Sequence, residues 1–253
     1  MHTDVWIIAG GLAVGFLYGL FGVGSAFATP VLSLLGVPGM AAVVSPLPAL
    51  LPGSAAGAWS YSRKGKVDWN VAKAALTGAF PAAIAGALTS RFVGGPALLV
   101  LSGIVLFFVG LRIVQPGQPV AEVVAARRRA SPIFVITAAA GVGFAAGLLA
   151  NGGGFLFVPL FMLALGLDIH EAAGTSLVVA VALTVPTLVT HTLIGDIDWT
   201  IAGVFALGLI PGALAGSRTA HLIPTAPLRH AFGILLIGSA LWFLTRQALV
   251  LTS

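Results

Sequence analysis

The sequence predicts an all-α membrane protein with several membrane-spanning helices, and three observations support this fold class. Of the 253 residues, 58% are hydrophobic and only 8% are charged, whereas about a quarter of the residues in a soluble domain are charged. No charged side chain occurs at residues 5–62 or at residues 132–167, although a spanning helix needs only about 20 apolar residues. The third observation is an internal repeat, which divides the chain into two similar halves.

The repeat is clearest in two short polar loops. The motif "GKVDW" at residues 65–69 recurs as "GDIDW" at residues 195–199, so the offset is 195 − 65 = 130 residues. The same offset pairs Gly78 with Gly208, Pro81 with Pro211 and Gly86 with Gly216. We therefore expect a first membrane repeat at residues 1–115, a basic cytoplasmic linker at residues 116–131 and a second membrane repeat at residues 132–253.

Each repeat is expected to contain three spans and a longer opening piece. The spans are predicted at residues 41–62, 69–91 and 96–112, and again at residues 172–194, 199–220 and 227–245. The opening pieces, residues 5–36 and 132–167, would each be about 50 Å long as one helix, against a hydrocarbon core of about 30 Å. Glycine clusters in "FGVGSAFATP" and "ANGGGFLFVP" mark a break in each piece, which is then two spans or a re-entrant hairpin. In total we expect about 8 to 10 membrane segments, including broken or re-entrant helices.

The two repeats are predicted to have inverted topology. A two-legged opening piece adds no net crossing, so each half crosses the membrane an odd number of times and the halves face opposite ways. Cytoplasmic loops carry an excess of Lys and Arg, and placing the linker inside puts most basic residues inside as well. These residues are Arg63, Lys64, Lys66, Arg112, Arg127, Arg128, Arg129, Arg218 and Arg229, while Arg91 and Arg246 are exceptions. Both chain termini are then outside the cytoplasm.

The glycine breaks also predict a function. Non-helical backbone at membrane depth is tolerated where it faces protein or a water-filled cavity, and inverted-repeat transporters direct half-helix N-termini at anionic substrates. Glycines allow backbone N–H groups to approach such a ligand closely. The predicted substrate-binding residues are Gly22, Gly24, Ser25, Ser45, Asn151, Gly152, Gly153, Gly154, Thr175 and Ser176.

Several of these residues also have a structural interpretation, which stays open at this point. Single glycines are common in membrane helices because they allow close packing. Ser45, Thr175 and Ser176 are equally suited to hydrogen bonds between helices. His191 is either interfacial or a gating residue, and Glu171 is either a solvated loop residue or the acid that couples transport to protons. Asp68 and Asp198 precede a Trp in each half and are interpreted as helix caps.

The pattern of motifs resembles that of the TauE/SafE family of sulfite and organosulfonate exporters. The residues that carry this resemblance are "NGGGFLFVP" at 151–159, the two "G-x-[VI]-D-W" loops and the helices with "G-x-[FI]-P-x-x-[IL]-A-G". The first half departs from the pattern, because "GVGSAFATP" lacks the triple glycine. The resemblance implies a secondary transporter of a small sulfur-containing anion, located in the cell (inner) membrane and surrounded by the lipid bilayer. We expect no cofactor, no metal and no nucleic-acid partner, and leave a homo-oligomer open.

Three other functions remain as alternatives. A passive anion channel and an uptake permease of the same family have the same sequence features. An intramembrane serine protease would use Ser25 as the nucleophile and His191 as the base, but the residue that corresponds to Ser25 in the second half is a glycine. The expectation that the resemblance favours is export of sulfite or a short organosulfonate, driven by the membrane potential, with no enzymatic activity.

Overall fold

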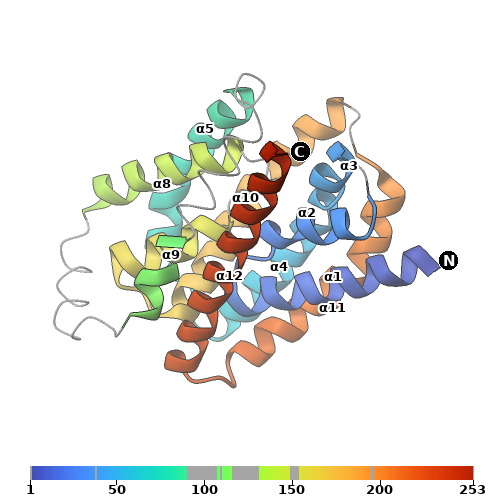
Figure 1. The fold of residues 1–253 in the computed structure, drawn as a ribbon. Coiled ribbons are helices and arrows are strands. Elements are labelled where there is room, and N and C mark those ends of the chain that lie inside the picture. The colour runs from blue at the N-terminus through green and yellow to red at the C-terminus, as the bar shows by residue number, and fades with distance from the viewer. Residues whose placement is uncertain are drawn as a thin grey trace.

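The computed structural model describes residues 2–37, 39–89, 107–108, 110–115, 131–148, 154–194 and 197–252, and within these ranges the chain forms helices and no strand (Figure 1). The helices of the first half are α1 (His2–Phe21), α2 (Ser25–Leu34), α3 (Gly39–Val44), α4 (Leu47–Arg63) and α5 (Trp69–Thr89). Those of the second half are α8 (Pro132–Leu148), α9 (Gly154–Leu165), α10 (Ile169–Ile194), α11 (Trp199–Ala220) and α12 (Thr225–Thr252). Among the described residues, α1, α5, α10 and α11 are long and apolar enough to cross a membrane. The predicted all-α membrane fold is confirmed.

Each opening piece consists of two helices, as the glycine clusters predict. In the first half α1 has 20 residues and α2 has 10, and in the second half α8 has 17 and α9 has 12. At 1.5 Å per residue, α2 and α9 are only about 15 and 18 Å long. The second leg of each opening piece is therefore shorter than the hydrocarbon core.

One span that was predicted as a single helix is divided into two in the structure. Residues 41–62 were expected as one span, but the structure ends α3 at Val44 and starts α4 at Leu47. Pro46 lies at this break, and proline has no N–H group with which to continue a helix. The corresponding residue in the second half is Ser176, and α10 runs unbroken from Ile169 to Ile194.

The two halves have opposite directions, which is visible where α4 packs on its repeat counterpart α10. A Cβ atom placed on Gly174 would lie 2.8 Å from Cβ of Tyr61, and one on Gly57 would lie 2.9 Å from Leu177. Residue numbers thus rise along α10 as they fall along α4, so the two helices are antiparallel. Because α4 and α10 are equivalent in the repeat, their antiparallel packing supports the predicted inverted topology.

The helices that border this central pair are packed by glycines. Helices α1 and α11 lie side by side (Figure 1). Three glycines of α1 lie against backbone carbonyls of α11, and three glycines of α11 lie against carbonyls of α1. The pairs that show this are Gly11 with Phe205, Gly15 with Leu209, Gly19 with Ala213, Gly208 with Ile8, Gly212 with Leu12 and Gly216 with Phe16. Residue numbers rise together along the two helices, so α1 and α11 are parallel. For these glycines, the packing interpretation is confirmed.

Contacts between helix ends gather the basic residues at one end of the molecule. Tyr61 donates its hydroxyl to the Leu20 carbonyl at 3.0 Å, which joins the ends of α4 and α1. His170 Nε2 lies 2.9 Å from the Ala220 carbonyl oxygen, which joins the start of α10 to the end of α11. The last turns of α4 and α11 contain Arg63 and Arg218, and Lys64 and Lys66 follow α4. Arg229 lies near the start of α12 and is bonded to Ile113, the neighbour of Arg112. We call this region the basic end.

Candidate functional site

The first glycine break lies directly against α10. Gly22 has φ of +76°, a conformation that favours glycine, and its N–H donates to the Tyr18 carbonyl at 2.8 Å. A Cβ atom at Gly22 would lie 2.5 Å from the Ser176 hydroxyl oxygen and 2.9 Å from the Ala173 carbonyl oxygen. The structure thus brings Gly22 and Ser176 together in a tightly packed contact.

The rest of the two glycine clusters is described in part. A Cβ atom at Gly24 would overlap Cβ of Tyr18, so this position also requires a glycine. Helix α2 begins at Ser25, and α9 begins at Gly154. Asn151, Gly152 and Gly153 lie outside the described residues, and their assignment to the substrate site stays a prediction.

Ser45 and Thr175 join the two halves through a matched pair of hydrogen bonds. The backbone N–H of Asp198 donates to the Ser45 hydroxyl at 3.2 Å, and the N–H of Asp68 donates to the Thr175 hydroxyl at 3.0 Å. Since 175 − 45 and 198 − 68 both equal 130, the two bonds are equivalent in the repeat. Reciprocal contacts of this kind are expected between two similar units that are related by a two-fold axis.

The carboxylates of these loops cap helices, as the sequence analysis proposed. Asp68 Oδ1 accepts the N–H groups of Asn70 and Val71, both at 3.1 Å. Asp198 Oδ1 accepts those of Thr200 at 2.9 Å and Ile201 at 3.1 Å. Each "D-W" loop therefore starts its own helix with its side chain and binds the other half with its backbone.

The predicted site residues do not form one cluster. Thr175 follows Gly174, which lies beside Tyr61 at the last turn of α4, whereas Ser45 precedes the first residue of α4. The 17 residues of α4 are about 26 Å long. Thr175, Ser176 and Gly22 therefore lie toward the basic end, and Ser45 lies toward the opposite end.

The interior between these ends carries hydroxyl groups. Among the described residues, the fully buried serines and threonines are Ser45, Ser54, Thr175, Ser176, Thr184 and Ser217. Most of them donate to carbonyl oxygens of their own helix, as Ser54 does to Leu50 at 2.8 Å and Thr184 does to Ala180 at 2.7 Å. No carboxylate is among the buried side chains of the described residues.

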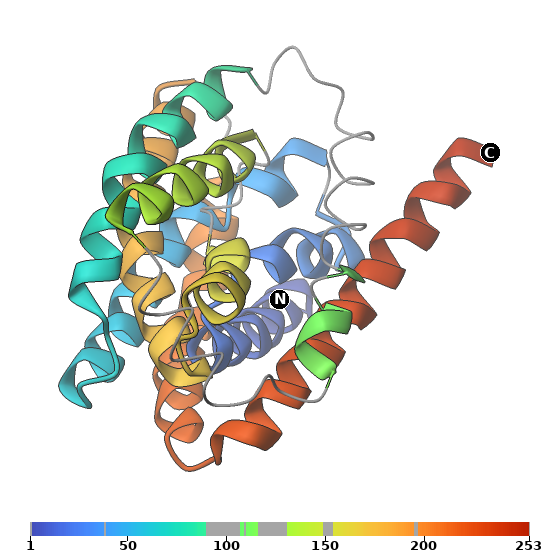
Figure 2. The ribbon, with the colours of Figure 1, turned by 90° about the vertical axis from the view of Figure 1, so that its left-hand side faces the viewer.

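A pocket at the basic end was not foreseen from the sequence. Its volume is about 430 Å³, and its polar lining comprises Arg112, Gln115, Asp168, Thr225 and Arg229. Arg229 is held in place because its Nε donates to the Ile113 carbonyl at 3.1 Å. Figure 2 shows the short helical segment at residues 110–114 beside α12. No motif marks these arginines, because the pocket forms from three segments that are far apart in the sequence.

Glu171 and His191 occupy different ends of α10. The N–H of Glu171 donates to Asp168 Oδ1 at 2.8 Å in the first turn of the helix, where a negative charge interacts favourably with the helix dipole. His191 is near the last turn, 15 residues beyond Ser176, or about 22 Å along the helix. Ser25 begins α2 within a turn of Gly22, which contacts Ser176. The backbone positions of Ser25 and His191, the two residues of the alternative protease site, are therefore far apart.

Two histidines, His170 and His221, lie beside Tyr61 at the basic end. The His221 ring packs edge-on against Tyr61, with 4.8 Å between centroids, and stacks with His170 at 6.1 Å. Burial lowers the pKa of His221, and the nearby positive charges of His170, Lys64 and Lys66 lower it further. Within the described residues no group of His, Asp and Glu is suited to hold a metal ion.

Comparison with known proteins agrees with this architecture. The family model described as "Sulfite exporter TauE/SafE" matches residues 7–243. The chain belongs to the TauE/SafE family. Relatives of this TauE/SafE protein include a "Probable membrane transporter protein" of Xylella fastidiosa (strain 9a5c), 32% identical over 252 residues that cover 96% of this chain and 95% of the relative.

Two relatives from Bacillus subtilis (strain 168) have the same general description. The "Probable membrane transporter protein YjnA" is 28% identical over 94% of this chain and 98% of its own length. The "Probable membrane transporter protein YdhB" is 26% identical over 86% of this chain and 91% of its own length. No solved structure matches the chain. This TauE/SafE protein is therefore a membrane transporter and not an enzyme.

Proposed function

We propose that this protein is a secondary transporter of the cell membrane that exports a small sulfur-containing oxyanion, either sulfite or a short organosulfonate. The observation that carries the proposal is the buried polar lining, which in the described residues consists of hydroxyl groups and His170 without a carboxylate. A hydroxyl group that rotates away from the carbonyl of its own helix can donate a hydrogen bond to an anion, whereas a buried carboxylate would repel it. The family description supports the sulfur-containing substrate.

The membrane potential supplies the driving force in this proposal. Carriers that use a proton or sodium gradient generally hold an ionisable residue inside the membrane. Glu171 is instead in the first turn of α10 at the basic end. An anion that leaves a cell with a negative interior gains about 2.3 kcal/mol per charge per 100 mV, which corresponds to about a fortyfold concentration ratio.

The pocket at the basic end is proposed as the entrance. Positive residues concentrate on the cytoplasmic side of membrane proteins, so the basic end faces the cytoplasm in this proposal. Arg112 and Arg229 line the pocket there, and guanidinium groups bind oxyanions through paired N–H donors. An anion would therefore meet a positive potential before it enters the hydroxyl-lined interior.

Reconstituted vesicles test the transport itself. In proteoliposomes preloaded with sulfite, a potassium and valinomycin potential that is negative inside should accelerate sulfite efflux. Saturation and counterflow of labelled sulfite are expected for a carrier, and their absence would favour a channel. Efflux that ignores the imposed potential contradicts the proposal, as does efflux that stops in Glu171→Gln.

A pair of arginine variants tests the entrance. We expect Arg112→Gln to raise the sulfite concentration needed for half-maximal efflux by about tenfold, because one charged hydrogen bond contributes about 1.5 kcal/mol. Arg63→Gln is the matched control, since Arg63 is at the same end but lies over the Trp59 ring, 5.0 Å from its centroid. Equal effects of the two substitutions would show that only the general surface charge matters.

A further inference from the structure

One buried polar group has no partner in the protein, and it lies at the centre of the molecule. Tyr18 is completely buried, with 0% of its surface exposed. Its hydroxyl makes no hydrogen bond, and it is one of two such buried side-chain atoms among the described residues. A buried donor without a partner costs stability, and a phenylalanine would fill the same space without this cost.

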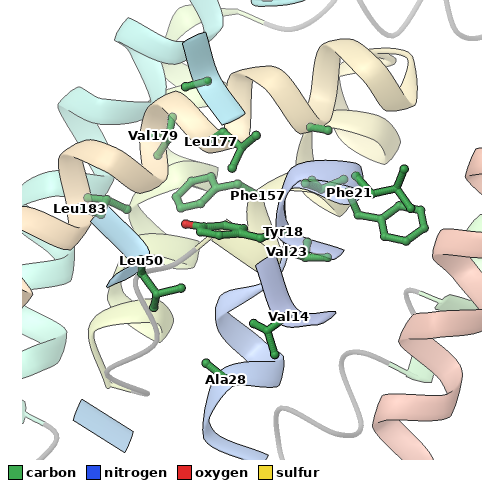
Figure 3. Close-up of a cluster of buried hydrophobic side chains, with 14 of the residues drawn as sticks. Val14, Tyr18, Phe21, Val23, Ala28, Leu50, Phe157, Leu177, Val179 and Leu183 are labelled. Atoms are coloured by element: carbon green, nitrogen blue, oxygen red, sulfur yellow. The ribbon is translucent and has the colours of Figure 1, made fainter. Parts of the chain in front are cut away.

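The Tyr18 hydroxyl is directed into the interface between the two repeat-related helices. Figure 3 shows the ring beside Phe157, with its oxygen toward Leu50 of α4 and Leu183 of α10. These two leucines lie on the two antiparallel helices described above, and Leu183 is close to the midpoint of α10. The hydroxyl is therefore about halfway between the two ends of the molecule.

Two other hydroxyl residues, one on each of these helices, are equivalent in the repeat. Ser54 is on α4 and Thr184 is on α10, with 184 − 54 = 130, and both are fully buried. The Tyr18 ring lies against Gly53, since a Cβ atom there would be 3.9 Å from its Cδ1. Ser54 follows Gly53, and its hydroxyl donates to the Leu50 carbonyl at 2.8 Å. The Tyr18 hydroxyl has no hydrogen-bond partner in the protein.

The position of Tyr18 breaks the symmetry between the halves. In the offsets that relate the opening pieces, Tyr18 corresponds to Ala146 and Phe157 corresponds to Ala28. The two aromatic rings that lie side by side in Figure 3 therefore have alanines at both equivalent positions. Packing alone does not require a phenol at residue 18, because its hydroxyl makes no hydrogen bond.

We propose that Tyr18 is a substrate-binding residue, whose hydroxyl donates a hydrogen bond to an oxyanion oxygen at the midpoint of the transport path. Ser54 and Thr184 complete this site from the two repeats. The inference rests on the proposed function and names its central site. The phenol stays neutral in this role and supplies its one O–H donor. The cost of the unpartnered donor is offset when the anion binds.

Two buried tyrosines give a matched test. Tyr18→Phe removes an unpartnered hydroxyl, whereas Tyr61→Phe removes one that is bonded to Leu20 at 3.0 Å. For Tyr18→Phe we expect sulfite efflux to fall about tenfold or more, with an unchanged or higher unfolding temperature in detergent. For Tyr61→Phe we expect a lower unfolding temperature, with the stabilisation by sulfite retained.

Ligand-induced stabilisation separates this inference from the proposed function. Sulfite should raise the unfolding temperature of the wild type, and this rise should be lost in Tyr18→Phe and reduced in Thr184→Val. Wild-type behaviour of Tyr18→Phe in both assays overturns the inference, and so does a loss of stability like that of Tyr61→Phe.

A panel of other anions covers the case in which the substrate assignment fails. If sulfite neither stabilises nor leaves vesicles with the wild type, the proposed substrate is wrong. The same unfolding assay with sulfate, phosphate and methanesulfonate then decides the site. A rise in the wild type that Tyr18→Phe abolishes supports Tyr18 as an oxyanion site, and no rise with any anion rejects it.

Discussion

The two helix pairs α1·α11 and α5·α8 are equivalent in the repeat, but they are packed by different numbers of glycines. The first pair has three contact glycines on each helix, and the second pair has two on each. In the second pair, Ala82 is at the position that corresponds to Gly212, and Ala139 is at the position that corresponds to Gly11. A Cβ atom on Gly143 would lie 2.5 Å from the Ala79 carbonyl oxygen, and one on the equivalent Gly15 would lie still closer to that of Leu209. The same architecture therefore tolerates some alanine, and close packing is stricter where α1 meets α11.

The largest expected effect is the loss of this close packing. Gly15→Val should prevent the accumulation of folded protein, because its side chain collides with a backbone carbonyl that is fixed in α11. Overpacking usually costs about 1 to 3 kcal/mol, and a collision with backbone lies at or above that range. Gly143→Val should also destabilise the fold, but less. Folded yield and unfolding temperature in detergent measure both.

Gly203→Val is the control for these two variants. Gly203 is on α11 as well, but a Cβ atom there would meet nothing within 4 Å. We expect nearly normal yield for Gly203→Val. If all three valine variants behave alike, helix propensity and not helix contact is responsible.

An intermediate effect is expected at the two hydrogen bonds that join the halves. Ser45→Ala leaves the N–H of Asp198 without its partner, and Thr175→Val does the same to Asp68. Each substitution should lower the free energy of unfolding by about 1 to 3 kcal/mol. Thr175→Ser keeps the hydroxyl and should restore stability. Strongly unequal losses would show that the two contacts are not equivalent in strength.

The smallest expected effect is a pH dependence of stability that comes from the loop after α11 and has no histidine counterpart in the loop after α5. His221 follows α11, and the corresponding residue of the first half is Arg91, which lies outside the described residues. Because the pKa of His221 is lowered from 6.5 in the folded protein, the unfolded chain binds the proton first as the pH falls. Its contribution to stability is present above about pH 6.5 and decreases below it.

The variant His221→Gln should flatten this pH dependence. The unfolding temperature, measured in steps from about pH 8 to pH 5, should fall less toward acid for the variant than for the wild type. Parallel curves would contradict the assignment to His221.

The sequence predicted the local features of this protein better than its long-range contacts. Glycine breaks, the Asp68 and Asp198 caps and the helix α11 follow from composition and short motifs, so they were predicted with correct positions. The break at Pro46 was missed because proline is tolerated within membrane helices, as it is in α10 at Pro186.

The candidate site was predictable only in part, for a physical reason. Ser45 and Thr175 were identified as functional or helix-joining residues, and the structure shows the bonds that join the halves. The pairing of each with a loop of the opposite half depends on the tertiary fold. Tyr18 was not identified from the sequence, and Arg112 was identified only as a cytoplasmic basic residue, since an unpartnered hydroxyl or a shared pocket exists only once distant helices are packed together.

The parallel packing of α1 on α11 has a consequence for biogenesis. The glycines of α1 meet their partners in a helix that begins at Trp199, so about 180 residues must be added after α1 before this contact can form. The close packing of α5 likewise forms only after α8 of the second half has been synthesised. During synthesis the first half is therefore inserted with its close-packing surfaces uncovered, and contacts between distant residues form slowly. A chain that is cut at the linker would yield two fragments that depend on each other to fold, and the native protein assembles only when both are in the same membrane.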